Sequence, residues 1–256
     1  MTPEVMRHMR INQHRFGPRE HRNLVSYTIQ EVVENDCYNL WRLSDIKFGG
    51  LIDIGANYGI FSAAIRNLWG FESALKPIVA YEPNPTTYGY LTEVAGFYGV
   101  QPVACGLGDD AHIWMDTEPK GSPMCAVSSD VGGLNSSKVW GASLDSILRD
   151  FVKVNGVCDN LLLKIDCEGA EWGISKDVKE LWKVHTIVME LHQHHNGQPL
   201  PFPPRTLATR DSDRPSAVVE CFKNGPLSHL PGFSVVAAEA GDNEHSPIMI
   251  TLQRKE

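Results

Sequence analysis

The stretch that decides the fold is Leu51-Ile-Asp-Ile-Gly-Ala-Asn-Tyr-Gly-Ile-Phe-Ser62. It begins as an apolar run typical of a strand buried on both faces, and from Ile60 onward its apolar residues follow the helical period. Gly55 and Gly59 lie at the junction, where they remove Cβ atoms from a backbone that must bend sharply and approach a ligand. The helix N-terminus that follows offers unpaired N–H groups and a positive dipole end. The stretch therefore predicts a nucleotide-binding turn between a strand and a helix.

The residues around this turn differ from those of a dinucleotide site. The pattern Gly55-Ala-Asn-Tyr-Gly59 does not match Gly-x-Gly-x-x-Gly, which argues against a pyrophosphate ligand. Asp53 suits the cationic amino group of S-adenosylmethionine, whose own carboxylate could then bind the N–H groups of the turn. Downstream, Ile78-Val-Ala-Tyr-Glu82 predicts the next strand, with an acid at its C-terminal end that could accept hydrogen bonds from both ribose hydroxyls. These features favour S-adenosylmethionine as the cofactor.

Length and composition indicate one α/β domain with an appendage. A chain of 256 residues with 42% hydrophobic content can bury a full core, and two large domains are not expected. The net charge of −8 argues against nucleic acid or an anionic membrane as a partner. No apolar run has the length of a membrane span, and the N-terminus lacks a signal-peptide core, so we expect a cytoplasmic protein. The six cysteines form no Cys-x-x-Cys pair, and we interpret them as reduced packing residues.

Residues 1–48 are expected to form an arm, a helix and a lid, ahead of the main domain at 49–256. Residues 1–23 contain five arginines and two glutamates, a charge opposite to that of the whole chain. We interpret them as a frayed or surface-docked tail, with substrate or partner recognition as the alternative. The alternation from Tyr38 to Leu43 suggests a short strand or lid. A helix with one apolar face is predicted by Val25, Ile29, Val32 and Val33.

After Glu82 the chain alternates between helices and strands, as a doubly wound sheet requires. Asn84 and Pro85 predict the N-terminus of a helix. Residues 101–105 predict an edge strand, because the proline within them cannot donate to a central ladder. The turn at residues 106–109 follows, and in such a sheet it faces the adenine of the cofactor.

The second half of the chain completes the sheet. Residues 110–142 lack helical periodicity and predict a hairpin and a loop. Further helices are expected at 143–152, where Ser143 is the cap, and at 174–182 and 216–222. Further strands are expected at 161–165, 186–189, 233–238 and 247–252. The last strand should be antiparallel, because a loop of about eight residues is too short for a parallel crossover.

Five motifs appear in order along the chain between about residue 45 and residue 195. They are Asp53–Gly59, Glu82–Pro85, Ser143-Leu-Asp145, Lys164-Ile-Asp-Cys-Glu-Gly-Ala-Glu171 and Glu190-Leu-His192. In these motifs the chain resembles the FkbM family of S-adenosylmethionine-dependent methyltransferases. The resemblance implies the class I methyltransferase fold, a doubly wound, Rossmann-like sheet of seven strands. It also implies O-methylation of a hydroxyl on a sugar, a polyketide or a similar metabolite, without naming the acceptor.

The catalytic residues are expected where acids converge at the carboxyl ends of the strands. A hydroxyl is a poor nucleophile until a base takes its proton, and His192 is the natural base, with Glu190 holding its other ring nitrogen. Asp166 is the rival candidate. We therefore predict His192, Asp166 and Glu190 as the catalytic residues. The predicted cofactor contacts are Asp53, Gly55, Ala56, Asn57, Gly59, Glu82, Pro83, Asn84, Leu107 and Asp166.

Several alternatives stay open at this point. Glu168 and Glu171 lie three residues apart at a helix start, where the plain role is capping and dipole compensation. We predict no metal, although a divalent ion held by Asp166, Glu190 and His192 is conceivable. A small hydroxylated acceptor is the expected partner, and an oligomer is possible. The rival functions are a catalytically silent S-adenosylmethionine-binding protein and a nucleotide-cofactor oxidoreductase on the same scaffold.

Overall fold

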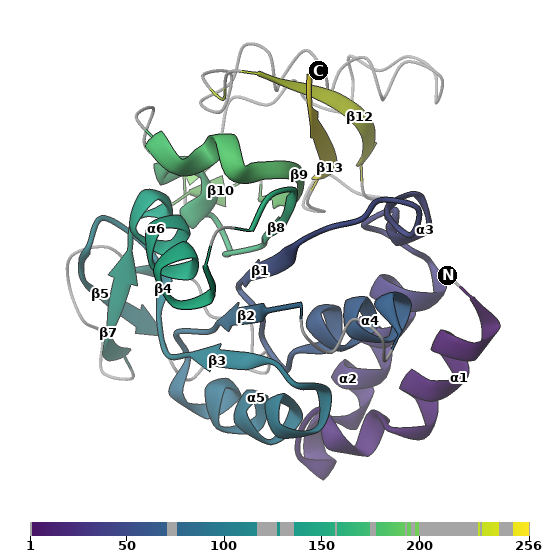
Figure 1. The fold of residues 1–256 in the computed structure, drawn as a ribbon. Coiled ribbons are helices and arrows are strands. Elements are labelled where there is room, and N and C mark those ends of the chain that lie inside the picture. Colours follow the sequence, from purple (N-terminus) through teal and green to yellow (C-terminus); the bar gives the residue numbers. More distant parts are fainter. Residues whose placement is uncertain are drawn as a thin grey trace.

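A seven-stranded sheet with helices on both faces forms the centre of the computed structural model (Figure 1). In spatial order, its strands are β12 (Phe233–Ala240), β13 (Ile248–Arg254), β9 (Val184–Leu191), β8 (Leu161–Ile165), β1 (Gly50–Ile54), β2 (Ile78–Tyr81) and β3 (Gln101–Val103). The last strand in the chain, β13, is antiparallel to both of its neighbours, and the remaining pairs are parallel. The predicted class I methyltransferase sheet, with its antiparallel last strand and its edge strand β3, is confirmed.

The structure describes most of the chain apart from several loops and one long segment. The described residues are 2–70, 76–116, 127–128, 136–156, 158–174, 178–192, 194–195, 198–199, 230, 232–240 and 248–255. The helix expected at 216–222 and much of the loop expected within 110–142 lie outside them. Four of the six cysteines are described, and all four are free thiols.

Successive residues of the central strands point to opposite faces of the sheet and build two core layers. Leu51 and Leu162 pack in the layer that includes α4 (Ile60–Trp69) and α5 (Pro85–Tyr98). Ile52 and Leu163 pack in the layer that includes α6 (Leu144–Asn155). Both faces are therefore buried, as expected for parallel strands with helical crossovers. The carboxyl ends of the strands remain as the natural place for a ligand.

Two helix starts form as their sequences predict. Asn84 caps α5, and its side chain accepts a hydrogen bond from the Thr86 N–H at 2.9 Å. Ser143 caps α6 by accepting a hydrogen bond from the Ser146 N–H at 3.2 Å. A capping side chain satisfies one of the N–H groups that an isolated helix leaves unpaired. These caps fix where the chain re-enters the helical layers after β2 and before β8.

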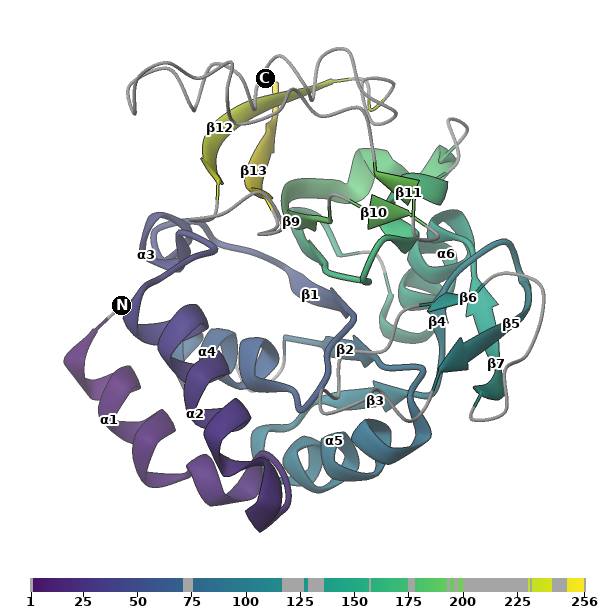
Figure 2. The same ribbon diagram turned by 180° about the vertical axis from the view of Figure 1, so that it is seen from behind.

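The N-terminal arm is docked against the main domain. It contains α1 (Pro3–Ile11), two short 3-10 helices at Gln13–Arg15 and Arg19–His21, and α2 (Arg22–Ile29), which continues as a π-helix at Gln30–Glu34. Figure 2 shows α1 and α2 lying beside α4 and α5. Met9, Phe16 and Val33 are buried in the same core layer as those helices. The boundary predicted at residue 48 stays a prediction, because this core is shared across it.

Two local predictions are wrong. The strand suggested between Tyr38 and Leu43 is instead the short helix α3 (Leu40–Leu43). Asp36 caps it by accepting the Leu40 N–H at 2.6 Å, and the left-handed backbone of Asn39, at φ 54°, interrupts the alternation. The helix expected at 174–182 is replaced by two 3-10 helices, at Ala170–Gly173 and Lys179–Lys183.

A second, smaller sheet follows the edge strand β3. Its order is β4 (Gly106–Leu107), β7 (Ser136–Ala142), β5 (Ala111–Asp116) and β6 (Val127–Ser128). The antiparallel pairing of β5 with β7 confirms the predicted hairpin. A further two-stranded pair joins β10 (His194–His195) to β11 (Gln198–Pro199). Within the described part of the chain, none of the helices combines the length and apolar character needed to cross a bilayer.

Substitutions at two glycines test whether the left-handed backbone at Gly59 requires glycine. Gly59 has φ 77°, and a Cβ there would lie 2.7 Å from Leu91 Cδ1, so Gly59→Ala is expected to lower the free energy of unfolding by about 1–2 kcal/mol. Gly89 lies within α5 with open space around it, so Gly89→Ala should raise the free energy of unfolding by up to about 1 kcal/mol. Urea denaturation measures both. Equal effects of the two substitutions would contradict the expected strain at Gly59.

Candidate functional site

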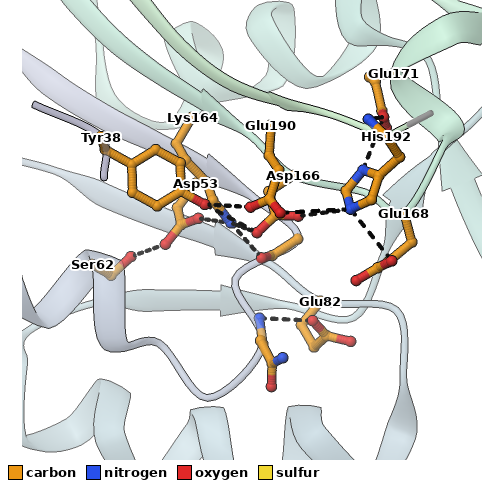
Figure 3. Close-up of polar contacts among 12 residues, drawn as sticks. Tyr38, Asp53, Ser62, Glu82, Lys164, Asp166, Glu168, Glu171, Glu190 and His192 are labelled. Carbon is orange, nitrogen blue, oxygen red and sulfur yellow. Dashed lines mark hydrogen bonds and ion pairs between the residues drawn. The ribbon is translucent and has the colours of Figure 1, made fainter. Parts of the chain in front are cut away.

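Acidic side chains from different strands meet at the carboxyl edge of the large sheet (Figure 3). Asp166 directly follows β8, while Glu190 lies near the end of β9 and His192 directly follows it. Tyr38 reaches the same place from the N-terminal arm. The three residues predicted as catalytic are therefore brought together, as the topology of a parallel sheet requires.

Lys164 is the buried cation of this region. Its ammonium lies 3.4 Å from Asp53 Oδ1 and 3.1 Å from Asp166 Oδ2, and Asp53 also accepts a hydrogen bond from Ser62 at 2.7 Å. Burial opposes the charge of Lys164, but the two carboxylates outweigh this effect and raise its pKa. Asp53 is 0% exposed and belongs to β1 rather than to the turn. Its predicted contact with the amino group of the cofactor therefore stays a prediction.

The glycine turn is bonded to the neighbouring strands. Lys164 Nζ donates to the Gly55 carbonyl at 2.6 Å, and a Cβ at Gly55 would lie 1.6 Å from the Asp166 carbonyl oxygen. The N–H groups of Gly55 and Ala56 both donate to the Tyr81 carbonyl at 3.0 Å. The end of β2 therefore accepts these two N–H groups, and the predicted contacts of Gly55 and Ala56 with the cofactor stay predictions.

Glu82 ties the turn to the second crossover. Its carboxylate accepts the N–H groups of Asn57 and Asn84, each at 2.8 Å. Burial raises its pKa, although these bonds favour the charged form. Thr87 Oγ1 also donates to this carboxylate at 3.4 Å, so of its about four lone-pair positions one remains for a ligand hydroxyl such as one of a ribose. The predicted ribose contact of Glu82 stays a prediction that this geometry accommodates.

Two buried acceptor atoms next to the turn test whether S-adenosylmethionine fits. Asp53 Oδ1 and Asn57 Oδ1 have no hydrogen-bond donor, although the former has the ionic contact with Lys164 described above. Unsatisfied buried acceptors are rare and call for an explanation. A ligand with an ammonium and two hydroxyl groups brings the missing donors. The residues present therefore fit this cofactor better than a ligand whose groups only accept hydrogen bonds.

His192 is held by Glu171, not by Glu190 as predicted. Glu171 Oε1 contacts His192 Nδ1 at 3.0 Å and accepts the His192 backbone N–H at 2.8 Å. Glu171 is 0% exposed and also accepts the Gly169 N–H at 2.9 Å, so the predicted capping role is only part of its function. Glu190 lies on the other side of the ring, 3.8 Å from Nε2.

The protonation states around His192 follow from the local charges. Burial would lower the pKa of His192, but the hydrogen bond and charge of Glu171, with the charge of Asp166, raise it to about 10. Burial also raises the pKa of Glu168 to about 7 and, together with the charge of Asp166, raises that of Glu190 to about 8. At neutral pH, His192 is therefore a proton-carrying imidazolium and Glu190 a neutral acid.

Asp166 is the ionised group of the cluster. Burial would raise its pKa, but the charges of Lys164 and His192 outweigh this and hold the pKa below its usual value. Its side chain is 24% exposed, whereas Asp53 and Glu171 are closed to solvent. Asp166 therefore combines negative charge with access to a bound molecule.

Three residues of the site were not predicted as site residues. Lys164 could have been singled out, because a charged residue in the run Leu161-Leu-Leu-Lys-Ile165 of a buried strand requires a partner. Tyr38 carried no such signal, since it lies 128 residues before Asp166 in the chain. Glu171 matched a helix-capping pattern, which concealed its contact with His192. Leu107 is buried in the core layer with Ile52, and its predicted contact with adenine stays a prediction.

Asp166, Glu168 and His192 also have the spacing of a metal site, with one ligand atom of each within 4.8 Å of the others. Glu168 takes the place of the Glu190 considered from the sequence. A metal ion would have to displace the proton that His192 carries among these carboxylates. The expectation that no metal is needed stays a prediction, and the assay described below tests it with a chelator.

Known proteins provide a comparison with this geometry. The FkbM methyltransferase domain matches residues 53–210. Methyltransferase sdnD of Sordaria araneosa is 24% identical over 221 residues, which cover 74% of this chain and 82% of that protein. A putative O-methyltransferase from Klebsiella pneumoniae is similar in structure, with a TM-score of 0.47, 12% identity, and coverage of 100% of this chain and 91% of the other.

The magnesium protoporphyrin IX methyltransferase of Synechocystis PCC 6803, solved with S-adenosylmethionine bound, has a TM-score of 0.43 and 9% identity, over 95% of this chain and 89% of that one. The family match spans more than half of the chain and contains the turn, Glu82 and the cluster around Asp166. The chain belongs to the FkbM methyltransferase domain family.

Proposed function

We propose that this enzyme transfers the methyl group of S-adenosylmethionine to a hydroxyl group of a small acceptor in the cytoplasm. The acceptor class that the family resemblance suggests is a sugar, a polyketide or a similar metabolite. One observation carries the proposal: Lys164 contacts both the Gly55 carbonyl of the glycine turn and the ionised Asp166. The side chain of Lys164 thus connects the candidate base, Asp166, to the candidate cofactor site.

The cofactor, when bound, supplies an electrophilic methyl group on a positively charged sulfur. Glu82 and Asn57 would hold it through the acceptor positions described above, and Gly55 and Gly59 keep the turn free of Cβ atoms. Methyl transfer needs the acceptor oxygen in line with the methyl group, so much of the rate comes from positioning.

The remaining task is to remove the proton from the acceptor hydroxyl. As the new C–O bond forms and the S–CH₃ bond breaks, this proton must move to a base. Of the two predicted candidates, Asp166 is ionised at neutral pH, whereas His192 already carries a proton. We therefore assign the base to Asp166. His192 and Lys164 are the cations that keep it charged.

The charge of the site also limits which acceptor molecules can bind. Asp166, Glu168 and Glu190 all lie within 4.0 Å of His192 Nε2, and Asp166 is ionised at neutral pH. An anionic acceptor bound beside Asp166 would be repelled by that carboxylate. A neutral molecule with several hydroxyl groups can donate hydrogen bonds to these acids. This favours a neutral polyhydroxylated acceptor over a phosphorylated or carboxylated one.

A methyl-transfer assay tests the proposal. The enzyme would be incubated with isotopically labelled S-adenosylmethionine and extracts of hydroxylated metabolites, with and without EDTA, and labelled products identified by mass spectrometry. Label in an ether-linked methyl group, unaffected by EDTA, is expected. Cofactor binding without transfer in a broad screen would instead support a silent binding protein, and loss of activity with EDTA would show that a metal is required.

A further inference from the structure

Tyr38 belongs to the N-terminal arm, yet its hydroxyl lies between two acids of the site (Figure 3). The hydroxyl oxygen is 3.2 Å from Asp166 Oδ2 and 3.1 Å from Glu190 Oε2. The side chain is buried, and its ring packs edge-on against Phe61 of α4 with a centroid distance of 5.0 Å. Packing therefore fixes the position of this hydroxyl from the side of the arm.

The two contacts limit which of the three side chains, the Tyr38 phenol and the two acids, can carry a proton. A phenol carries one proton, and an ionised carboxylate can only accept hydrogen bonds. If Tyr38 donates to one acid, a hydrogen bond with the other requires that acid to carry a proton. Glu190 is the acid that does so, because burial and the charge of Asp166 raise its pKa to about 8. The direction of the bonds is then from Glu190 to Tyr38 and from Tyr38 to Asp166.

We propose that Tyr38 is a positioning residue for methyl transfer: its hydroxyl bridges Asp166 and Glu190 and holds the carboxylate of Asp166 in place as the base. This inference rests on the proposed function. It makes the arm part of the active site, because the arm supplies a second donor to Asp166 Oδ2 beside Lys164 of β8.

The surroundings of Tyr38 keep its hydroxyl protonated, so that it can donate a hydrogen bond. Burial, followed by the charges of Asp166 and Glu190, raises the pKa of the phenol well above its ordinary value. The other titratable groups near the pair are Lys164, His192 and Glu168 from the sheet side and Glu31 and Cys37 from the arm. Burial raises the pKa of Cys37 as well. Tyr38 therefore keeps its proton across the pH range of an activity assay.

Tyr38→Phe retains the ring and removes the hydroxyl. A hydrogen bond to the ionised form lowers the pKa of an acid, so its loss should raise the pKa of Asp166. Activity requires ionised Asp166 and is lost as the pH falls through this pKa. The acidic limb of the kcat profile should therefore move up by about one pH unit. At pH 7 Asp166 stays ionised in both proteins, so the fall in kcat there, about 10-fold, comes from the lost positioning of its carboxylate.

The matched control is Tyr90→Phe, a half-buried tyrosine of α5 that lies outside the acidic cluster. It should leave kcat, the KM for S-adenosylmethionine and the pH profile unchanged. In Tyr38→Phe the KM for S-adenosylmethionine should stay within about twofold, because the hydroxyl does not contact the turn. A Tyr38→Phe enzyme with wild-type kcat and an unshifted acidic limb would overturn the inference.

Glu190→Gln tests the same arrangement without altering the arm. In the wild type, kcat should also fall as the pH rises past about 8 and Glu190 loses its proton, because the single proton of Tyr38 is then shared between two carboxylates. Glutamine has no proton to lose, so the limb near pH 8 should disappear. Its persistence would refute the inference even if Tyr38→Phe did not fold. If the wild type shows no methyl transfer at all, the proposed function itself has failed.

Discussion

Replacing Asp166 with asparagine is expected to lower kcat by about 10²- to 10⁴-fold, the usual contribution of a general base. Asparagine has almost the same shape but cannot take a proton from the acceptor hydroxyl. Affinity for S-adenosylmethionine should change little, because the turn keeps its contacts with Tyr81 and Glu82. Steady-state kinetics with the identified acceptor and calorimetry with the cofactor would separate the two effects.

The control for this variant is Asp150→Asn, an exposed aspartate on α6 that should leave kcat unchanged. His192→Ala should also be measured, since His192 was the first candidate from the sequence. If Asp166→Asn turned over normally and His192→Ala did not, the base would be His192 and the assignment to Asp166 would be wrong. Normal turnover in both variants would exclude both residues.

Replacing Lys164 with methionine is expected to reduce the free energy of unfolding by about 3–5 kcal/mol, the typical cost of removing one partner of a buried ion pair. The side chain of Lys164 is 4% exposed and compensates Asp53 and Asp166, which would remain as buried carboxylates without a cation between them. The Gly55 carbonyl would also lose its donor. Urea denaturation with and without S-adenosylhomocysteine measures the loss.

Lys153→Met on the exposed side of α6 is the matched control, with an expected change within about 0.5 kcal/mol. Equal stability of the two methionine variants would mean that the Lys164 cluster contributes no net stability. The Asp53→Asn, Lys164→Met double variant should recover part of the loss, because residue 53 then carries no charge and Asp166 keeps the nearby cation of His192.

Much of the fold was predictable because local signals agreed with one another. The change of period at Ile60, the cap at Asn84 and the short connection before β13 each indicate an element without reference to distant residues. The predictions that were wrong concern short elements. At residues 38–43, Asn39 takes a left-handed conformation, and the cap from Asp36 outweighs an alternating pattern.

The candidate site was only partly predictable, for a different reason. Acids that follow strands share one edge of a parallel sheet, so the proximity of Asp166, Glu190 and His192 follows from the topology. Their hydrogen-bond partners do not. Whether Glu171 or Glu190 holds His192 depends on the path of the turn after β8, and Tyr38 reaches the site only because the arm docks on α4.

The central claim is that residues 53–59, at the end of β1 and in the turn after it, bind S-adenosylmethionine together with Glu82. Isothermal titration calorimetry with S-adenosylhomocysteine tests it directly on wild type, Glu82→Ala and the exposed α5 control Glu93→Ala. We expect one binding site in the wild type and in Glu93→Ala, with affinity at least about tenfold weaker in Glu82→Ala. No binding heat in the wild type, together with none for S-adenosylmethionine, or equal affinity in all three proteins, would contradict the account.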